Sequence, residues 1–350
     1  MKLFSLPYLA YSRIITSMNP IEVISLSFCS KKSRERIKQI HFHVDYAGIS
    51  TKVNKFKAPV FQLRISTGGR HLSIPFQTAP RPARCEGRRF TWTIDGVKHY
   101  FRCGESQLGS IIYSNIPKSY FKITNNILDL VRASLSILEL DLNVINDLKG
   151  FITEPCMKSV SGIKVVSETI TAEKLSIFFN NIENPVKDVF IYSKVEGEVS
   201  TSLNIFRSDR LIAFKADWVT RENILGFNGK FLCLFNPTID IGTIIEFIKQ
   251  WRNGNNTKFV ALKMAKVPQE LMKIDQFISE FNAKPWDPTK REKCYIYEKE
   301  ITDKQNIVAD LSEGFDFERH DGLLATIKIR PPDFFQFFVW HKRFTAENRT

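Results

Sequence analysis

The first forty residues carry apolar side chains at helical spacing, interrupted where a proline follows an asparagine. Asn19-Pro20 ends the first run, and Pro20 stands near the start of a second helix, a position that tolerates its missing N–H. A third, basic segment follows from Lys31 to Ile40. The pattern predicts three short helices with more apolar residues than a private core needs, so we expect a partner surface here.

From about residue 42 the apolar period changes to two, which is typical of β-strands. Phe61, Leu63 and Ile65 alternate with polar residues. Phe90 to Ile94 and Val97 to Phe101 flank Asp95-Gly96, a pair that accepts the positive φ angles of a tight hairpin turn. These residues predict a β-rich middle segment that contains a hairpin.

Between about residues 130 and 290, short apolar strands alternate with amphipathic helices. Thr171, Thr220 and Asp240 are predicted to cap helices, and the helix after Asp240 runs to Trp251 before Asn253-Gly254. Expected strands are 189–192, 211–214, 231–235 and 259–264. This alternation, without a Gly-rich nucleotide turn, favours an open arc like that of leucine-rich repeats over a doubly wound sheet.

The C-terminal part returns to a strand pattern. Cys294 to Tyr297 is strand-like, and Phe315 to Arg319 and Leu324 to Ile329 flank the turn His320-Asp321-Gly322. Phe334 to Trp340 is a further expected strand. The predicted fold class is therefore α+β: N-terminal helices, a β-rich segment, and a strand-and-helix arc closed by a C-terminal β-hairpin sheet.

Composition narrows the class of protein. The chain has 350 residues, of which 43% are hydrophobic, so it can bury a core, and a disordered or collagen-like chain is excluded. The six cysteines are scattered, which favours reduced thiols inside the cell, cytoplasmic or nuclear, over a secreted disulfide scaffold. The N-terminal apolar stretch contains Pro7 and Arg13, so we expect folded protein rather than a signal peptide, and no membrane span.

The positive charge is concentrated in one stretch. The formal net charge is +13, and residues 52–104 hold eleven Lys and Arg against Glu86 and Asp95, a local +9. A candidate patch for an acidic partner lies at Arg81, Arg84, Arg88 and Arg89. Aromatic residues are interleaved with this charge, so a nucleic-acid groove in residues 52–104 is an alternative function, beside a solvated sheet face.

No signature of catalysis or of a cofactor site is present. The chain lacks a nucleophile elbow, a phosphate-binding loop and a zinc-protease helix. Two weak metal candidates exist: Cys85 with His99 and Cys103, and His41 with His43 on one side of an expected strand. Ordinary buried or polar positions explain both sets, so we expect no enzyme, no cofactor and no metal.

Two segments together resemble a known family. The N-terminal residues resemble an F-box of the expanded nematode kind, through Leu6-Pro7-Tyr8-Leu9-Ala10, Arg13-Ile14-Ile15, the run from Met18 to Ile24 and the run from Leu26 to Lys32. The later chain is similar to the type-2 F-box-associated domain of that group. Its markers are Trp218-Val219-Thr220, Asp240 to Trp251, Phe259 to Met264, Phe317 to Ile327 and Phe338-Val339-Trp340.

The resemblance implies a non-catalytic substrate-recognition adaptor of a Skp-cullin-F-box ubiquitin ligase. Its implied partners are a Skp-type adaptor, a cullin scaffold and an unknown protein target. The positions that match the family's Skp-contacting pattern are Leu6, Pro7, Ile14, Met18, Pro20, Ile21, Leu26 and Ser27. The implied division is an F-box at 1–45, a basic β-rich segment at 46–130, and the associated domain at 131–350.

Two other interpretations stay open at this point. The apolar N-terminal residues can instead pack against residues 42–150 of the same chain. The chain can also be a degenerate receptor that recruits no target.

Overall fold

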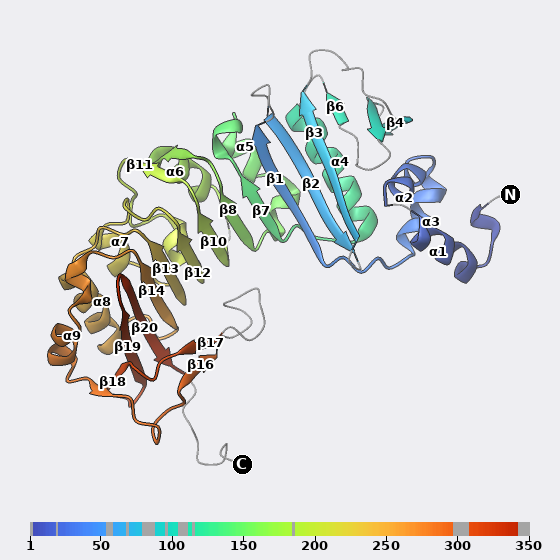
Figure 1. Cartoon of the computed structure of the whole chain (residues 1–350). Helices are drawn as coiled ribbons and strands as arrows, with labels where there is room; N and C mark the ends of the chain where they lie inside the picture. Colours follow the sequence, from blue (N-terminus) through green and yellow to red (C-terminus); the bar gives the residue numbers. More distant parts are fainter. Residues whose placement is uncertain are drawn as a thin grey trace. The chain divides into compact units, whose positions relative to one another are not determined.

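The computed structural model describes residues 3–18, 20–53, 59–67, 70–78, 88–94, 97–103, 111–113, 116–183, 186–296 and 308–341. These residues form helices and strands in an α+β arrangement, as the sequence predicts (Figure 1). The chain divides into two compact units, Met1–Val166 and Ser167–Thr350. The first unit therefore contains the N-terminal helices, the β-rich segment and part of the predicted strand-and-helix region.

The N-terminal helices lie where the apolar pattern places them. A short 3₁₀ turn, η1 (Leu3–Ser5), precedes α1 (Tyr8–Ser17), α2 (Pro20–Ser27) and α3 (Lys31–Lys38). Ser30 caps α3 by accepting a hydrogen bond from the Ser33 N–H at 3.0 Å. The buried apolar residues of this segment are Tyr11, Ile15, Val23, Ile24, Ile37 and Ile40, and α2 and α3 pack against each other and against the later helix at Ile116–Val131.

A mixed sheet makes up most of the first unit. Its strands are β1 (Tyr46–Val53), β2 (Pro59–Thr67), β3 (Arg70–Thr78), β4 (Arg88–Ile94), β5 (Val97–Cys103), β6 (Ile111–Tyr113), β7 (Ile137–Leu140) and β8 (Gly162–Val165). The order in this unit is β8-β7-β1-β2-β3-β6-β5-β4. The predicted alternation is confirmed, since Phe61, Leu63 and Ile65 are all buried on β2. The predicted hairpin is confirmed by the antiparallel pairing of β4 with β5, although its turn residues lie outside the described residues.

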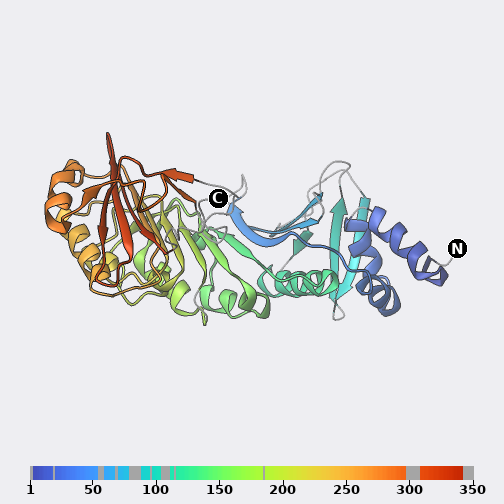
Figure 2. The ribbon, with the colours of Figure 1, turned by 90° about the horizontal axis from the view of Figure 1, so that it is seen from below.

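A long helix follows the β-rich strands within the segment that the sequence assigns to β structure. This helix, α4 (Ile116–Val131), lies along one face of β1 to β3 (Figure 2). The Tyr120 ring packs edge-on against Phe76 at 4.7 Å between ring centroids, and it is tilted against the Phe61 ring at 5.1 Å. Three short helical segments complete the unit: η2 (Leu142–Val144), α5 (Leu148–Ile152) and η3 (Pro155–Ser159).

The expected strand through His41 and His43 is wrong, because residues 41–44 form an irregular link between α3 and β1. The ladder between β1 and β2 ends at Tyr46 opposite Ser66, so no partner strand continues along the two histidines. His41 contacts the Arg132 guanidinium at 3.3 Å, and His43 lies 3.2 Å from the Asp45 carboxylate. The histidines therefore have different neighbours and do not form a strand-borne pair.

The second unit contains consecutive parallel strands with helices between them. The parallel strands are β10 (Asp188–Ile191), β12 (Arg210–Ala213), β13 (Phe231–Phe235) and β14 (Ala261–Ala265), paired in chain order. The helices are α6 (Ala172–Asn180), α7 (Arg221–Leu225), α8 (Ile241–Arg252) and α9 (Ile274–Phe281). Smaller elements are β9 (Thr169–Thr171), β11 (Lys194–Glu196), η4 (Asn204–Arg207) and η5 (Gln269–Met272). The predicted caps are confirmed: Thr171, Thr220 and Asp240 each accept a backbone N–H in the first turn.

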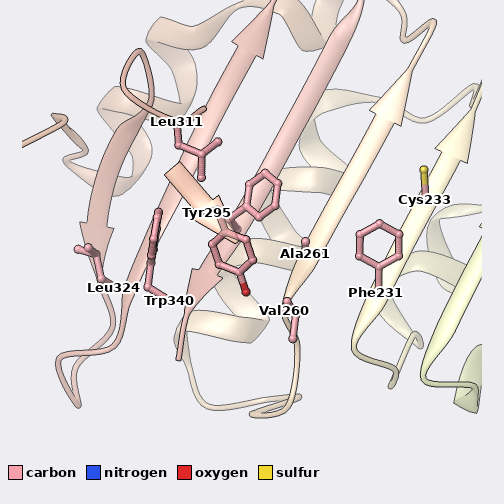
Figure 3. Close-up of a cluster of buried hydrophobic side chains, with 9 residues drawn as sticks. Phe231, Cys233, Val260, Ala261, Tyr295, Leu311, Leu324 and Trp340 are labelled. Carbon is pink, nitrogen blue, oxygen red and sulfur yellow. The ribbon is translucent and has the colours of Figure 1, made fainter. Parts of the chain in front are cut away.

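An antiparallel part closes this sheet on the side of β14, as the C-terminal strand pattern predicts. Its strands are β15 (Lys284–Pro285), β18 (Phe315–Glu318), β19 (Leu324–Arg330) and β20 (Phe334–Trp340), and β20 pairs with β14. Helix α8 packs on one face, where Trp251 meets Phe337. The separate hairpin of β16 (Cys294–Ile296) and β17 (Val308–Asp310) packs on the other face (Figure 3). There the Tyr295 ring packs against the rings of Phe338 and Trp340, with 5.0 Å between ring centroids in each pair.

A buried polar network fixes the hairpin on this face. The Arg291 guanidinium donates to the Asp316 carboxylate at 2.8 Å and to the Leu311 carbonyl at 2.8 Å. Thr326 donates its hydroxyl to Asp316 at 2.6 Å and accepts from the Trp340 indole at 2.8 Å. Because buried polar groups are costly unless they are paired, these hydrogen bonds favour one position of the hairpin on the sheet.

Candidate partner-binding surface of the N-terminal helices

Helix α1 buries some of its large apolar side chains and leaves others exposed. Tyr11 and Ile15 are 1% and 0% exposed, whereas Leu9 is 73% exposed. Tyr8 and Ile14 are also exposed, at 47% and 38%. A monomer gains nothing from placing three large apolar side chains in water along one helix, so the exposed part of α1 is suited to contact another protein. At about 100° per residue these three positions are spread around the exposed surface of the helix rather than aligned in one stripe. We call Tyr8, Leu9 and Ile14 together the α1 face.

The start of α1 depends on Pro7. Pro7 is the N-cap residue with a φ of −54°, and its carbonyl accepts the Ala10 and Tyr11 N–H groups at 3.0 and 3.1 Å. Because the pyrrolidine ring restricts φ to this region, Pro7 fixes the direction in which the helix leaves η1. Leu6 beside it is half-buried, and Pro7 itself is exposed. Leu6 and Pro7 therefore lie at the end of the α1 face.

Polar contacts hold the first turn of α1 against the end of α3. The Tyr8 hydroxyl donates to the Gln39 carbonyl at 3.3 Å, and the Tyr11 hydroxyl donates to the Gln39 side chain at 3.1 Å. The two tyrosine rings pack edge-on at 5.4 Å between centroids. The Tyr8 ring is thus exposed but oriented before any partner binds, which reduces the entropy lost on association.

The sequence-predicted contact residues fall into four groups. Pro7 and Ile14 are exposed, while Leu6, Met18 and Leu26 are half-buried. Ser27 is buried, and its hydroxyl donates to the Ile24 carbonyl at 2.6 Å. Pro20 and Ile21 begin α2, and their side chains lie outside the described residues. The structure brings Leu6, Pro7 and Ile14 onto helix α1 and the turn before it.

Sequence reasoning did not include Tyr8 and Leu9 among the contact residues. The signal was the unbroken run Leu6-Pro7-Tyr8-Leu9-Ala10, because a helix buries one stripe and cannot turn five successive apolar residues inward. Leu9 has the largest exposed fraction among the large apolar side chains that the structure describes. It is therefore the clearest single marker of the α1 face.

Helix α3 is attached to α4 through one carboxylate. Asp129 accepts from Arg34 and from Lys38, each at 2.8 Å, and Arg34 also donates to the Asn126 carbonyl at 2.9 Å. Partial burial opposes ionisation of Asp129, but the hydrogen bonds from Lys38 and Arg34 prevail and lower its pKa. The attachment uses a face of α3 and leaves the α1 face uncovered.

The predicted basic patch is largely outside the described residues. Arg81 and Arg84 lie in an undescribed segment, and Arg88 and Arg89 begin β4 with side chains that are not described. Cys85 is undescribed, and the side chains of His99 and Cys103 on β5 are likewise outside the description. The acidic-partner patch therefore stays a prediction, and so does the expectation that Cys85, His99 and Cys103 hold no metal.

Three other features of the described residues bear on function: metal sites, reactive thiols and membrane spans. No group of three or more His, Cys, Asp or Glu side chains in that part of the chain is arranged to hold a metal ion. Burial raises the pKa of the Cys156 and Cys233 thiols to about 12, so both are protonated at neutral pH. Within the described ranges, no helix is both long and apolar enough to cross a bilayer.

The N-terminal helices match a known protein family. Residues 3–45 match the family model of the F-box domain. The chain carries an F-box domain. The match covers η1 and helices α1 to α3, and the α1 face is therefore a surface of this F-box. F-box domains bind Skp-type adaptors, and an F-box domain supports a role as an adaptor in Skp-cullin-F-box ubiquitin ligases.

The chain is also similar along nearly its whole length to nematode proteins. An uncharacterized protein of Caenorhabditis elegans is 20% identical over 99% of this chain and 80% of its own length. A second is 20% identical over 98% of this chain and 78% of its own. A third uncharacterized protein of Caenorhabditis elegans is 22% identical over 97% of this chain and 93% of its own length. No solved structure matches the chain. These relatives agree with a nematode F-box protein, while the type-2 associated domain stays a prediction.

Proposed function

We propose that this protein is the substrate-recognition adaptor of a Skp-cullin-F-box ubiquitin ligase. The F-box docks a Skp-type adaptor, which connects the chain to the cullin scaffold, and the C-terminal domain recruits a protein target. The adaptor acts by proximity: it raises the effective concentration of target lysines near the ubiquitin-loaded enzyme and contributes no catalytic side chain. An intracellular site of action, cytoplasmic or nuclear, is part of this proposal.

The α1 face of the F-box is the observation that carries the proposal. Leu9 is 73% exposed on a helix whose other side buries Ile15 completely. Large apolar side chains that are exposed on a well-packed helix gain most when a partner covers them, at about 25 cal/mol per Å² of apolar area removed from water. Leu6, Pro7, Met18, Pro20, Ile21, Leu26 and Ser27 extend the proposed Skp-contacting set.

Co-purification with a Skp-type adaptor tests this function. Changing Leu6-Pro7 to Ala-Ala is expected to abolish recovery of the adaptor, because it removes an apolar contact and the fixed start of α1. Helical circular dichroism of the variant should stay unchanged. Full recovery of the adaptor by a folded variant would contradict the proposal.

The concentrated charge at residues 52–104 supports a second candidate, a nucleic-acid-binding protein. Changing Arg81, Arg84, Arg88 and Arg89 together should then reduce a steep salt dependence in a gel-shift titration. Absence of any shift with single-stranded or double-stranded probes at low salt removes this candidate.

A further inference from the structure

The second unit contains a cavity of about 580 Å³ on the sheet face opposite α8. The hairpin β16–β17 and the loop after it form one wall, with Asp310, Ser312 and Glu313. The strands β14, β19 and β20 form the floor. The volume lies in the range of cavities that hold a small ligand or a few side chains.

The floor of the cavity is a row of polar side chains from three neighbouring strands. Lys263 of β14 is opposite Gln336 of β20, and Gln336 is opposite Lys328 of β19. Residues in register on adjacent strands point to the same face, so the three side chains stand together. The next row places Arg330 opposite Phe334, and both also line the cavity.

The cavity has an excess of positive charge. Its lining includes the four cations Lys263, Lys293, Lys328 and Arg330 against the two carboxylates Asp310 and Glu313. Lys293 pairs with Asp310 at 3.1 Å, and Lys328 pairs with Glu313 at 3.1 Å. Each carboxylate thus pairs with one lysine, and among the described lining residues the cations outnumber the carboxylates by two.

Gln336 supplies a polar atom that has no hydrogen-bond partner among the described residues. It is 4% exposed, and its Oε1 accepts no hydrogen bond from the described residues. An amide can turn by 180° and present its N–H₂ instead, so Gln336 can meet either a donor or an anion. An unsatisfied buried polar atom is costly, and a ligand in the cavity would supply its missing bond.

Lys263 adds to the preference for an anion. Its ammonium lies 5.7 Å from the Phe338 ring centroid and 6.0 Å from that of Phe231. Desolvation by burial lowers the pKa of Lys263, and an anion bound beside the ammonium would raise it.

A row of aromatic rings leads across the same sheet toward the cavity. Tyr192 stacks on Phe214 at 4.2 Å between centroids, and Phe214 stacks on Phe235 at 5.1 Å. Phe235 is opposite Ala265, and Ala265 is opposite Phe334 at the cavity. Tyr192 is 37% exposed, and Phe214 and Phe235 are half-buried. We call Tyr192, Phe214 and Phe235 the aromatic row.

We propose that the cavity and the aromatic row bind an extended acidic segment of a partner protein, with an acidic side chain in the cavity and a neighbouring apolar side chain on the row. Charge complementarity selects the acidic side chain, and the rings provide apolar contact area. The carboxylates of Asp310 and Glu313 at the wall can accept hydrogen bonds from peptide N–H groups, and a phosphodiester backbone has no such donors, which favours a peptide over nucleic acid. The inference rests on the proposed function only in identifying this segment as part of the target.

Selection from a random nonapeptide display library against the intact chain tests the inference. We expect the recovered peptides to be enriched in Asp or Glu next to an aliphatic or aromatic residue. The best peptide is then synthesised with its acidic residue as glutamate, glutamine or phosphoserine, and binding is measured by fluorescence anisotropy. Stronger binding of either charged form than of the glutamine form supports the inference, and the comparison of the two shows whether carboxylate or phosphate is preferred.

Two variants locate the site. Arg330→Gln removes a cation from the cavity and is expected to weaken binding of the charged peptide about tenfold. Gln336→Leu removes an unsatisfied acceptor, so it should leave stability unchanged or higher while weakening the same peptide. Arg207→Gln, which changes an exposed arginine on η4 outside the cavity, is the matched control and should bind normally.

Three results would overturn the inference. The first is a library without enrichment of acidic residues, and the second is equal peptide binding by both cavity variants and the control. The third is that single-stranded RNA displaces the peptide and that this RNA binding itself requires Arg330. None of these measurements includes the Skp adaptor. Loss of adaptor binding in the Leu6-Pro7 variant is read separately, so failure of the cavity and failure of the proposed function give different results.

Discussion

Helices α1 and α8 have similar lengths but leave different amounts of apolar surface in water. On α8, the side chains of Ile244, Phe247, Ile248 and Trp251 are buried as one stripe against the sheet of the second unit. On α1, two large apolar side chains are buried, and the α1 face remains exposed. The difference shows what a partner surface is physically: an apolar excess that persists after the helix has filled its own core.

Leu9→Asp gives the largest expected effect on this comparison. A carboxylate at the most exposed position of the α1 face would have to lose its water in the complex, so adaptor affinity should fall more than about a hundredfold. Ile177→Asp is the matched control, because Ile177 is 43% exposed on α6 of the second unit. Titration of each purified chain with a Skp-type adaptor measures the effect. An equal loss of adaptor affinity in both variants would mean that the α1 face does not contribute specifically to adaptor binding.

Adjacent residues on α1 allow core and surface roles to be separated. Ile15→Ala opens a cavity at a position that is 0% exposed and should lower the free energy of unfolding by about 2–4 kcal/mol. Ile14→Ala should change it by less than about 0.5 kcal/mol but weaken adaptor binding. Urea denaturation monitored on α1 amides, together with adaptor titration, compares them. Similar destabilisation by both changes would remove the distinction between the two faces.

Asp240→Ala removes the N-cap of α8, the helix whose apolar stripe is buried within its own unit. Asp240 accepts from the Thr243 N–H at 2.8 Å, so losing this cap should destabilise α8 by about 1 kcal/mol without changing adaptor binding. Hydrogen bonds from Thr243 lower the pKa of Asp240 from its ordinary value of 3.8. The stabilisation is therefore complete above that value and is lost as pH falls through the lower folded pKa. Denaturation at several pH values should show the variant and the natural chain converging in acid.

Asp129→Asn should have the smallest effect. Its side chain is 53% exposed, so its bonds to Arg34 and Lys38 are screened, and their loss should cost less than about 1 kcal/mol. Faster amide hydrogen exchange in α3, with normal adaptor binding, is the expected result. A large loss of adaptor binding would show that the α1 face depends on this attachment.

Local sequence signals predicted much of the fold. The Thr171 and Asp240 caps, the alternation on β2 and the Phe334–Trp340 strand depend on neighbouring residues and were found. The sequence-based predictions failed where residues distant in the sequence determine the local structure. His41 and His43 alternate as a strand would, but the β1 ladder begins only at Tyr46, and no neighbouring strand supports them.

The candidate sites show the same limit. The Leu-Pro run indicated the F-box, but the split between buried Ile15 and exposed Leu9 depends on how α1 packs against α3. The cavity floor joins Lys263, Lys328 and Gln336, which are as many as 73 positions apart in the sequence, through the pairing of β14, β20 and β19. No local pattern reports such a register, because it follows from the hydrophobic face of the whole sheet.

Hydrogen–deuterium exchange of the intact chain, with and without a purified Skp-type adaptor, tests the central claim most directly. We predict that the adaptor slows exchange in peptides covering Leu6 to Met18, while peptides from α8 and β20 exchange at the same rate in both samples. Unchanged exchange across the F-box at saturating adaptor would contradict the account.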